Sequence, residues 1–273
     1  MAISHQTRWL LTATGLIIVA TAIIVSRANQ PTRRIAPLVA DFRVGGAAPA
    51  LSGATLAAQT DTLQISVAPQ ALPANASIEA ITAELHTALA YVSARTATAP
   101  AGPITVLILA DPHCALHGAA YTQTREAHVY TCAAIAPERA VNILAHEFVH
   151  QLAHDHYGDA HLRSDPILLE GWATWGAGYY WLGRHATFRA FLGGQAPLPL
   201  VTNHLGRPAA EMNTLYYQWA SFVEYLLLTY GRDAFDRLYR SGDGTAGSAD
   251  YQGVYGVDIA TLEAEWRAWL GSK

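Results

Sequence analysis

Lysine, cysteine and methionine are scarce in this sequence. Lysine supplies one of the 17 basic residues, and the 273 residues include two cysteines and two methionines. Since at most one intramolecular disulfide can form, the fold cannot depend on a cysteine framework. About half of the residues are hydrophobic, so a chain of this length can bury a sizeable core without such bonds.

Acidic residues are missing from the first 34 positions and dominate the rest. All 21 acidic residues follow Arg34, against 13 basic residues in the same stretch, which leaves a formal charge of −8. A nucleic-acid-binding protein needs a basic face. This charge distribution argues against nucleic acid as a partner.

Charged residues are also missing from residues 9–25, which are mostly apolar and follow Arg8 in a short polar leader. This pattern is typical of a secretory signal or a single membrane anchor. We therefore predict a hydrophobic leader helix within residues 1–34. The body is expected to be extracytoplasmic, anchored in the membrane through residues 9–25 or secreted if cleavage occurs near Ala28.

The charges that flank the apolar run favour the opposite orientation. Arg27, Arg33 and Arg34 outnumber the positive charges before the run, and positive residues tend to stay in the cytoplasm. The acidic body, together with one even pair of cysteines, outweighs this tendency. Cys114 and Cys132 are compatible with a disulfide in an oxidising compartment, and two unpaired buried thiols are the alternative.

The first part of the body predicts a small sheet with one helix. Residues 31–49 are rich in Pro, Gly, Ala and Arg without a regular period, so we place a linker at 35–59 and a domain at 60–273. Alternation, helical spacing and short apolar runs predict the other elements. They are strands at 62–67 and 104–109, a helix at 76–94, and a weaker strand at 128–132 that we place at the sheet edge.

From Pro137 onward the pattern is almost wholly helical. Proline suits the first turn of a helix, and the helix that begins at Pro137 runs to about His156. Asp165 caps a second helix, Pro166 opens it, and it fades near Gly183. Further helices are predicted at 213–230, 232–240 and 258–270. The order predicts an α+β fold with a small mixed sheet in the N-terminal half packed on a helical C-terminal half.

Residues 146–150 read His-Glu-Phe-Val-His and fall within the helix that begins at Pro137. Histidines four residues apart project from the same side of a helix, so His146 and His150 can bind one metal ion. Glu147 is offset beside that ion, where its carboxylate can take a proton from a metal-bound water. The opposite side of the helix carries apolar residues that can anchor it in the core, namely Val141, Leu144, Phe148 and Leu152.

The third metal ligand has two candidates, His156 and Glu170. Catalytic zinc takes three protein ligands and leaves one position for water. His156 reaches the ion only if the helix ends sharply at a left-handed residue, and the Cβ of Ala153 disfavours that turn. Glu170 follows a loop long enough to bring it back, and Gly171 permits close approach of two helices. We therefore predict Glu170 as the third ligand.

The sequence His146-Glu147-x-x-His150, followed by Glu170-Gly-Trp-Ala173, resembles the gluzincin metallopeptidases. The likeness is greatest to the peptidase MA-like domains related to the thermolysin and M1 aminopeptidase groups, and it covers roughly residues 60–270. The resemblance implies a zincin-like fold, Zn²⁺ as cofactor, and a peptide or protein as substrate.

The resemblance also implies a catalytic tyrosine. In the M1 relatives a tyrosine that opens the next helix stabilises the oxyanion. The stretch Tyr-Tyr-Gln-Trp-Ala is similar, and alignment on Ala220 selects Tyr216, with Tyr217 as second choice. Trp219 stands where those relatives have glycine. Thr174 stands where several of them keep an acidic residue that orients a ligand, which puts ligand orientation here in question.

The sequence thus predicts an enzyme that hydrolyses peptide bonds in extracytoplasmic peptides or proteins. Glu147 and Tyr216 are its expected catalytic residues, and the two histidines and Glu170 hold the zinc. One alternative is a metzincin-type peptidase that uses His156. The other is a non-catalytic, membrane-anchored envelope protein that keeps the metal as a structural element.

Overall fold

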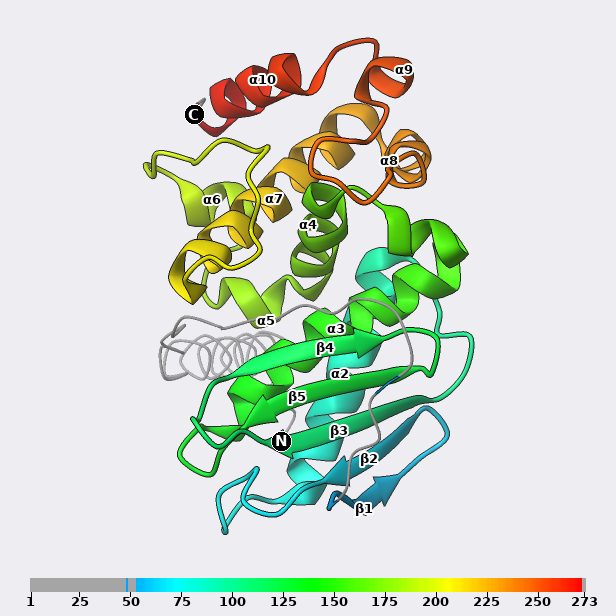
Figure 1. Cartoon of the computed structure of the whole chain (residues 1–273), viewed down its shortest axis with the longest axis vertical. Helices are drawn as coiled ribbons and strands as arrows, with labels where there is room; N and C mark the ends of the chain where they lie inside the picture. The colour runs from blue at the N-terminus through cyan, green and yellow to red at the C-terminus, as the bar shows by residue number, and fades with distance from the viewer. Residues whose placement is uncertain (1–47, 49–52, 272–273) are drawn as a thin grey trace, which may run out of the picture. The chain divides into compact units, whose positions relative to one another are not determined.

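A computed structural model describes residue 48 and residues 53–271 of the protein, and it shows one mixed sheet and a set of helices (Figure 1). The sheet order is β1-β2-β3-β5-β4. The two central pairings, β2 with β3 and β3 with β5, are parallel, and the two outer pairings are antiparallel. The strands are β1 (Thr55–Gln59), β2 (Leu63–Val67), β3 (Ile104–Ala110), β4 (His117–Tyr121) and β5 (Glu126–Thr131).

The sheet edge beside the helical half is β4, not the strand predicted at 128–132. His128 of β5 lies opposite Leu107 of β3 on one side and opposite Ala119 of β4 on the other. β4 reads His-Gly-Ala-Ala-Tyr, and its small residues give no alternation of polar and apolar side chains. The edge prediction was therefore wrong, because the strand that covers β5 carries no recognisable pattern in the sequence.

The helical half follows the sheet along the chain, as predicted, so the α+β class is confirmed. The predicted starts of the two site helices are also confirmed: one begins at Pro137, and in the next the Asp165 carboxylate accepts a hydrogen bond from the Ile167 amide. The helices are α2 (Ile78–Thr96), α3 (Pro137–Tyr157), the 3₁₀ helix η1 (Gly158–Arg163), α4 (Pro166–Ala177), α5 (Tyr179–Leu182), α6 (Phe188–Leu192), α7 (Ala209–Tyr230), α8 (Arg232–Tyr239), α9 (Tyr251–Tyr255) and α10 (Ile259–Gly271).

The core of the first half lies between the sheet and two helices. Figure 1 shows α2 and α3 crossing behind the strands. Val106 and Ile108 of β3, Leu85 of α2, and Leu144 and Phe148 of α3 are completely buried. Each such side chain contributes roughly 1.5–3 kcal/mol relative to exposure in water. This packing fixes the apolar side of α3, so the opposite side of the same helix is held in place.

The core of the second half brings α4 against α7. A Cβ on Gly171 would lie 2.7 Å from the carbonyl oxygen of Trp219 and 2.9 Å from Val223 Cγ2. Real Cβ atoms do not come so close to backbone, so only glycine allows this approach. The close contact that Gly171 was predicted to permit is therefore confirmed, although its partner is α7.

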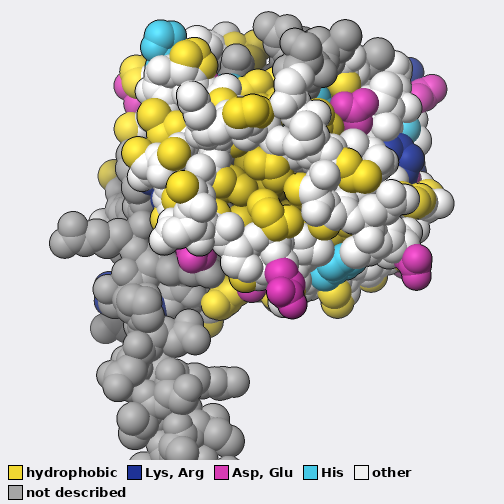
Figure 2. Space-filling model, turned by 90° about the horizontal axis from the view of Figure 1, so that it is seen from below, with side chains coloured by type: hydrophobic (Ala, Val, Ile, Leu, Met, Phe, Trp, Pro, Cys, Tyr) yellow, Lys and Arg dark blue, Asp and Glu magenta, His cyan; other side chains and the backbone are white. Residues whose placement is uncertain are grey.

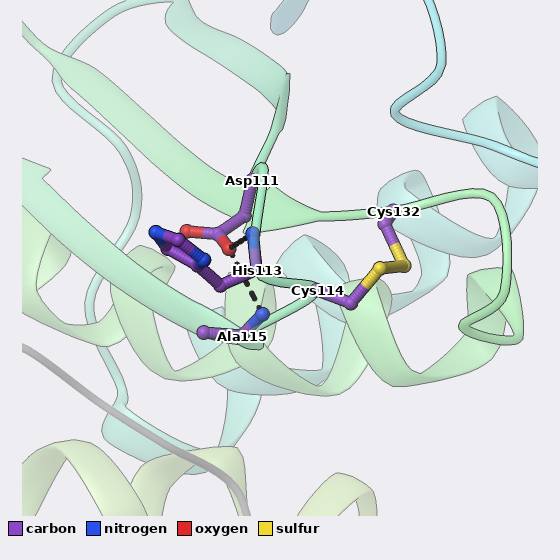
Figure 3. The surroundings of a disulfide bond; sticks show 5 residues. All are labelled: Asp111, His113, Cys114, Ala115 and Cys132. Carbon is purple, nitrogen blue, oxygen red and sulfur yellow. Dashed lines mark hydrogen bonds between the residues drawn. A yellow bond between two sulfur atoms is a disulfide. The ribbon is translucent and has the colours of Figure 1, made fainter.

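A disulfide joins Cys114 to Cys132, which resolves the alternative left open by the sequence (Figure 3). Cys114 lies in the loop between β3 and β4, and Cys132 directly follows β5. Asp111 Oδ1 accepts hydrogen bonds from the backbone amides of His113 (2.8 Å) and Ala115 (3.0 Å) in the same loop. The bond and these contacts fix the loop that leads into the edge strand.

The predicted leader, residues 1–34, lies outside the described residues, as does most of the predicted linker. The last part of that linker is wrong, because β1 occupies 55–59 and pairs with β2. In residues 48 and 53–271, no helix is both long and apolar enough to cross a bilayer. Figure 2 views the domain from the bottom of Figure 1, where β1 and β2 lie, and hydrophobic side chains gather near the centre of this face.

Candidate metal centre

The buried side of α3 that faces away from the sheet carries the two predicted histidine ligands. His146 and His150 are both completely buried. Their Nε2 atoms lie 3.1 Å apart, and their ring centroids are 4.9 Å apart. A spacing of four residues on a regular helix produces this convergence.

Glu170 of α4 completes the group. Its Oε2 lies 3.2 Å from His146 Nε2 and 3.6 Å from His150 Nε2. Zinc with ligands at 2.0–2.2 Å in a tetrahedron separates neighbouring donor atoms by about 3.3 Å. The observed separations match that value, and two imidazoles with one carboxylate are a donor set that zinc accepts while keeping a position for water. Among the described residues this is the one cluster suited to a metal ion.

The third ligand predicted from the sequence is therefore the one that the fold brings to the histidines. His156, the rival ligand, points elsewhere: its Nε2 lies 3.4 Å from Asp236 Oδ2 of α8, and its side chain is 34% exposed. α3 continues through Ala153 to Tyr157 without the sharp turn that a metzincin site requires. The structure gives no support to the metzincin alternative.

The protonation states of the ligands suit a cation. Burial lowers the pKa of His146 to about 4, since the charged imidazole would lose its hydration. Burial alone would raise the pKa of Glu170, but the charge of His150 and hydrogen bonds with both histidines outweigh it and lower that pKa to about 2. At neutral pH His146 is thus neutral and Glu170 ionised, the forms in which imidazole and carboxylate bind metals.

Thr174, one turn after Glu170 on α4, contacts the ring nitrogen of His146 that points away from the metal centre. Its hydroxyl oxygen lies 3.4 Å from Nδ1 of His146. A group on the far nitrogen of a metal-binding histidine fixes the ring orientation. The Thr174 hydroxyl is therefore placed to orient the ring of His146.

Glu147, which follows the ligand His146 in the sequence, is completely buried. Neither of its carboxylate oxygens makes a hydrogen bond within the described part of the chain. Burial, and then the charge of Glu170, raises its pKa well above the usual range. A divalent cation at the centre would lower that pKa again. Because an unpaired buried carboxylate costs stability, its presence indicates a role in chemistry.

The edge strand leaves room for this carboxylate at Gly118. A Cβ on Gly118 would collide with Glu147 Oε1 and with Ile143 Cγ2. Glu147 thus lies directly against the backbone of β4, and it follows His146 in the sequence. This placement puts a buried carboxylate where the edge strand meets the helix that carries the two histidines.

Alanine at position 118 should displace the Glu147 carboxylate without touching a metal ligand. We expect the Gly118→Ala protein to bind zinc as the parent does and to lose roughly 100-fold in catalytic efficiency, since a shift of about 1 Å can cost this much. Zinc content and peptide cleavage measure the two effects. Gly102→Ala is the matched control, because a Cβ there would be 3.8 Å from Arg125 Nε, an ordinary contact. Full activity of Gly118→Ala would contradict this placement.

The two tyrosines that open the candidate stretch of α7 point in different directions. Tyr216 is completely buried, and its ring centroid lies 6.1 Å from that of His146. The hydroxyl of Tyr217 instead donates to the carbonyl oxygen of Trp181, at 3.1 Å, and its ring stacks on Phe191. The geometry therefore favours Tyr216 over Tyr217 as the residue that faces the metal.

His204 also belongs to this region, and the sequence gave no sign of it. It lies in the loop before α7, with its ring 6.0 Å from that of Tyr216 and 5.4 Å from that of Trp219. Burial lowers its pKa, and the charge of Glu170 partly offsets this effect. A loop histidine without a local motif is recognisable only when the packing of the loop on α7 is known.

Comparisons with known proteins find similar chains among solved structures alone. No family model matches the sequence, and no curated protein matches it. The M1 zinc metallopeptidase from Deinococcus radiodurans is similar over 80% of this chain and 50% of its own, with 21% identity and a TM-score of 0.42. A two-domain M1 zinc metallopeptidase mutant bound to L-arginine is similar over 81% and 52%, with 19% identity and a TM-score of 0.41.

This chain spans about half the length of those solved structures. The buried triad itself fits the gluzincin arrangement of two histidines on one helix and a glutamate on the next. The metal centre, rather than the likeness in fold, defines what the chain can do chemically.

Proposed function

We propose that this protein is a zinc metallopeptidase that hydrolyses peptide bonds by a gluzincin mechanism. One observation carries the proposal: Glu147 is buried and unpaired within the described residues, beside three converging metal ligands. A site that only stored metal would need the ligands but not this carboxylate. The non-catalytic alternative leaves Glu147 without a purpose.

The chemistry divides among a few side chains. Zinc, when bound by the triad, would polarise the scissile carbonyl and acidify the attacking water. Glu147 accepts the proton of that water and delivers it to the leaving amine. Tyr216 donates a hydrogen bond from its phenol to the oxyanion of the tetrahedral intermediate.

The substrate is proposed to add to the sheet as an extended strand. Among the described strands β4 pairs with β5 alone, so its other side offers backbone groups for pairing. A peptide along β4 would pass Gly118 and therefore Glu147. Backbone pairing of this kind recognises main chain with little dependence on side chains. The strand predicted at the edge, 128–132, does not offer this position, because β5 lies between β3 and β4.

The substrates are proposed to be extracytoplasmic peptides or proteins. The disulfide between Cys114 and Cys132 supports an oxidising compartment, because such bonds are rare in the cytosol. The apolar run at 9–25 supports export as a signal or an anchor.

Zinc analysis combined with a peptidase assay tests the proposal. We expect one zinc per chain by elemental analysis and cleavage of an unstructured protein such as reduced casein. Chelation with a strong zinc ligand should abolish cleavage, and added zinc should restore it. Cleavage that survives complete removal of metal would rule out the mechanism, and a purified protein that binds no zinc would rule out the centre.

Loss of the Tyr216 hydroxyl should slow the chemical step alone. We expect Tyr216→Phe to lower kcat by roughly 100-fold to 1,000-fold, the usual effect of removing one oxyanion donor, with KM and zinc content little changed. Steady-state kinetics on a peptide separates the two constants. The control is Tyr217→Phe, which loses a hydrogen bond to Trp181 and so about 1 kcal/mol of stability, but no catalysis. Equal kcat losses in both variants would contradict the choice of Tyr216.

A further inference from the structure

Another buried imidazole, that of His161, lies beside the metal ligands and takes no part in the chemistry described so far. It belongs to η1, which directly follows α3, and it is completely buried. Its ring centroid lies 5.5 Å from that of His150. It is not a member of the group of three that converges on one point. A histidine in this position is adjacent to the centre without being a ligand.

One nitrogen of His161 has a defined partner. Its Nδ1 lies 2.9 Å from the hydroxyl oxygen of Tyr239, a completely buried residue of α8. Tyr239 stacks on Tyr157 at 4.2 Å, and the Tyr157 hydroxyl donates to Asp236 Oδ1 at 2.6 Å. The position of the Tyr239 phenol is thus fixed by its hydrogen bond with His161 and by its stacking on Tyr157. We refer to the two residues as the Tyr239–His161 pair.

The other nitrogen of His161, Nε2, is unpaired within the described part of the chain. Nε2 is buried and makes no hydrogen bond to any described residue. A buried nitrogen without a partner is costly and uncommon in a native protein. When the Tyr239 hydroxyl donates to Nδ1, the ring proton of the neutral imidazole stands on Nε2. His161 then carries an unused N–H donor in the interior.

The acceptor indicated for this donor is Glu170. The ring of His161 lies 5.5 Å from that of His150, and Nε2 of His150 lies 3.6 Å from Glu170 Oε2, so a single imidazole links His161 to this carboxylate. The charge of Glu170 also acts on both members of the pair. Glu170 has a second carboxylate oxygen besides the one that contacts the histidines. Residues that donate a hydrogen bond to a metal-binding carboxylate, without contacting the metal themselves, raise metal affinity.

We propose that the Tyr239–His161 pair supports the metal centre from outside, with His161 Nε2–H directed at the Glu170 carboxylate and Tyr239 fixing the tautomer. His161 is a positioning residue in this arrangement and not a ligand. The inference rests on the proposed zinc centre and adds a determinant of zinc affinity that lies outside the His-Glu-x-x-His sequence. It also explains why α8 packs onto the turn that follows α3.

Zinc affinity of the full-length protein tests the inference. The dissociation constant is measured by competition with a chelator of known affinity for the parent, His161→Phe, His161→Gln and Tyr239→Phe. We expect His161→Phe to weaken zinc binding by roughly 10-fold to 100-fold and Tyr239→Phe by less. His161→Gln restores a donor and should recover most of the loss. His156→Phe, which removes a histidine whose ring contacts Asp236 and Tyr157, should stay within about 2-fold of the parent.

Two further measurements distinguish a variant that does not fold from a failure of the inference itself. Circular dichroism of the metal-free forms shows whether each variant folds, and Tyr239→Phe replaces any His161 variant that does not. X-ray absorption counts the imidazoles on zinc: two per ion supports the inference, and three would overturn it by making His161 a ligand. Parent-like affinity in folded His161→Phe would also overturn the inference while leaving the zinc centre intact. A parent that binds no zinc would overturn the centre and the inference together.

Discussion

The substitution Glu170→Gln is expected to weaken zinc binding by more than about 100-fold. Mutation of a residue that only hydrogen-bonds a metal ligand already lowers metal affinity by roughly 10-fold to 100-fold, and Glu170 is itself a ligand. The Glu170 carboxylate is the one anionic ligand of the triad, and its Oε2 lies within 3.6 Å of both histidine nitrogens. Glutamine keeps the volume of the side chain but lacks the charge. Equilibrium dialysis against a zinc buffer measures the change.

The control for this substitution is His156→Ala. His156 of α3 is the rival candidate for the third ligand, and in the structure its side chain contacts Asp236 and not the other ligands. The zinc affinity of His156→Ala should therefore stay within about 2-fold of the parent. The opposite result, in which zinc remains on Glu170→Gln and leaves His156→Ala, would restore the metzincin alternative. If both variants kept their zinc, His146 and His150 would be sufficient to bind the ion.

Glutamine at position 147 is expected to abolish peptide cleavage and leave zinc bound. The amide cannot accept a proton from water, and general acid–base groups contribute roughly 100-fold to 10,000-fold. Since Glu147 is not a ligand, the zinc content should remain one per chain. Single-turnover cleavage and elemental analysis on the same sample give both values. A Glu147→Gln protein that cleaves at the parental rate would exclude this residue as the base.

The same substitution has a second expected effect in the metal-free protein. The folded-state pKa of Glu147 is raised by burial, so the folded chain binds this proton more tightly than the unfolded chain. By linkage the unfavourable contribution of Glu147 grows as the pH rises above the unfolded pKa. Metal-free Glu147→Gln should therefore unfold at a higher temperature than the metal-free parent at pH 8. A lower midpoint would show that the carboxylate has a structural partner.

Much of the site could be predicted because its spacing is local. His146 and His150 converge through the period of a single helix, and that period depends only on backbone geometry. The Cβ of Ala153 argued against His156, and Gly171 indicated a close helix contact. Both arguments concern the conformation or size of one residue, and both agree with the structure.

The parts that failed depend on residues far apart in the sequence. β4 has no pattern of its own and exists because β5 offers it a partner, so the edge of the sheet was assigned to the wrong strand. β1 was taken as linker for the same reason. Strand pairing is decided between segments, and a short strand of small residues has no local signal.

The sequence by itself determined the two histidines, the buried Glu147 between them and the glutamate of the next helix, since helix periodicity and the chemistry of zinc leave few choices. Tertiary structure decided which tyrosine lies beside His146, since neighbouring residues of one helix point in different directions according to what packs on each. It also brought Thr174 and the Tyr239–His161 pair to the ligands. These contacts join residues from different helices, which meet only when the chain folds. The spacing of residues within one helix therefore does not predict them.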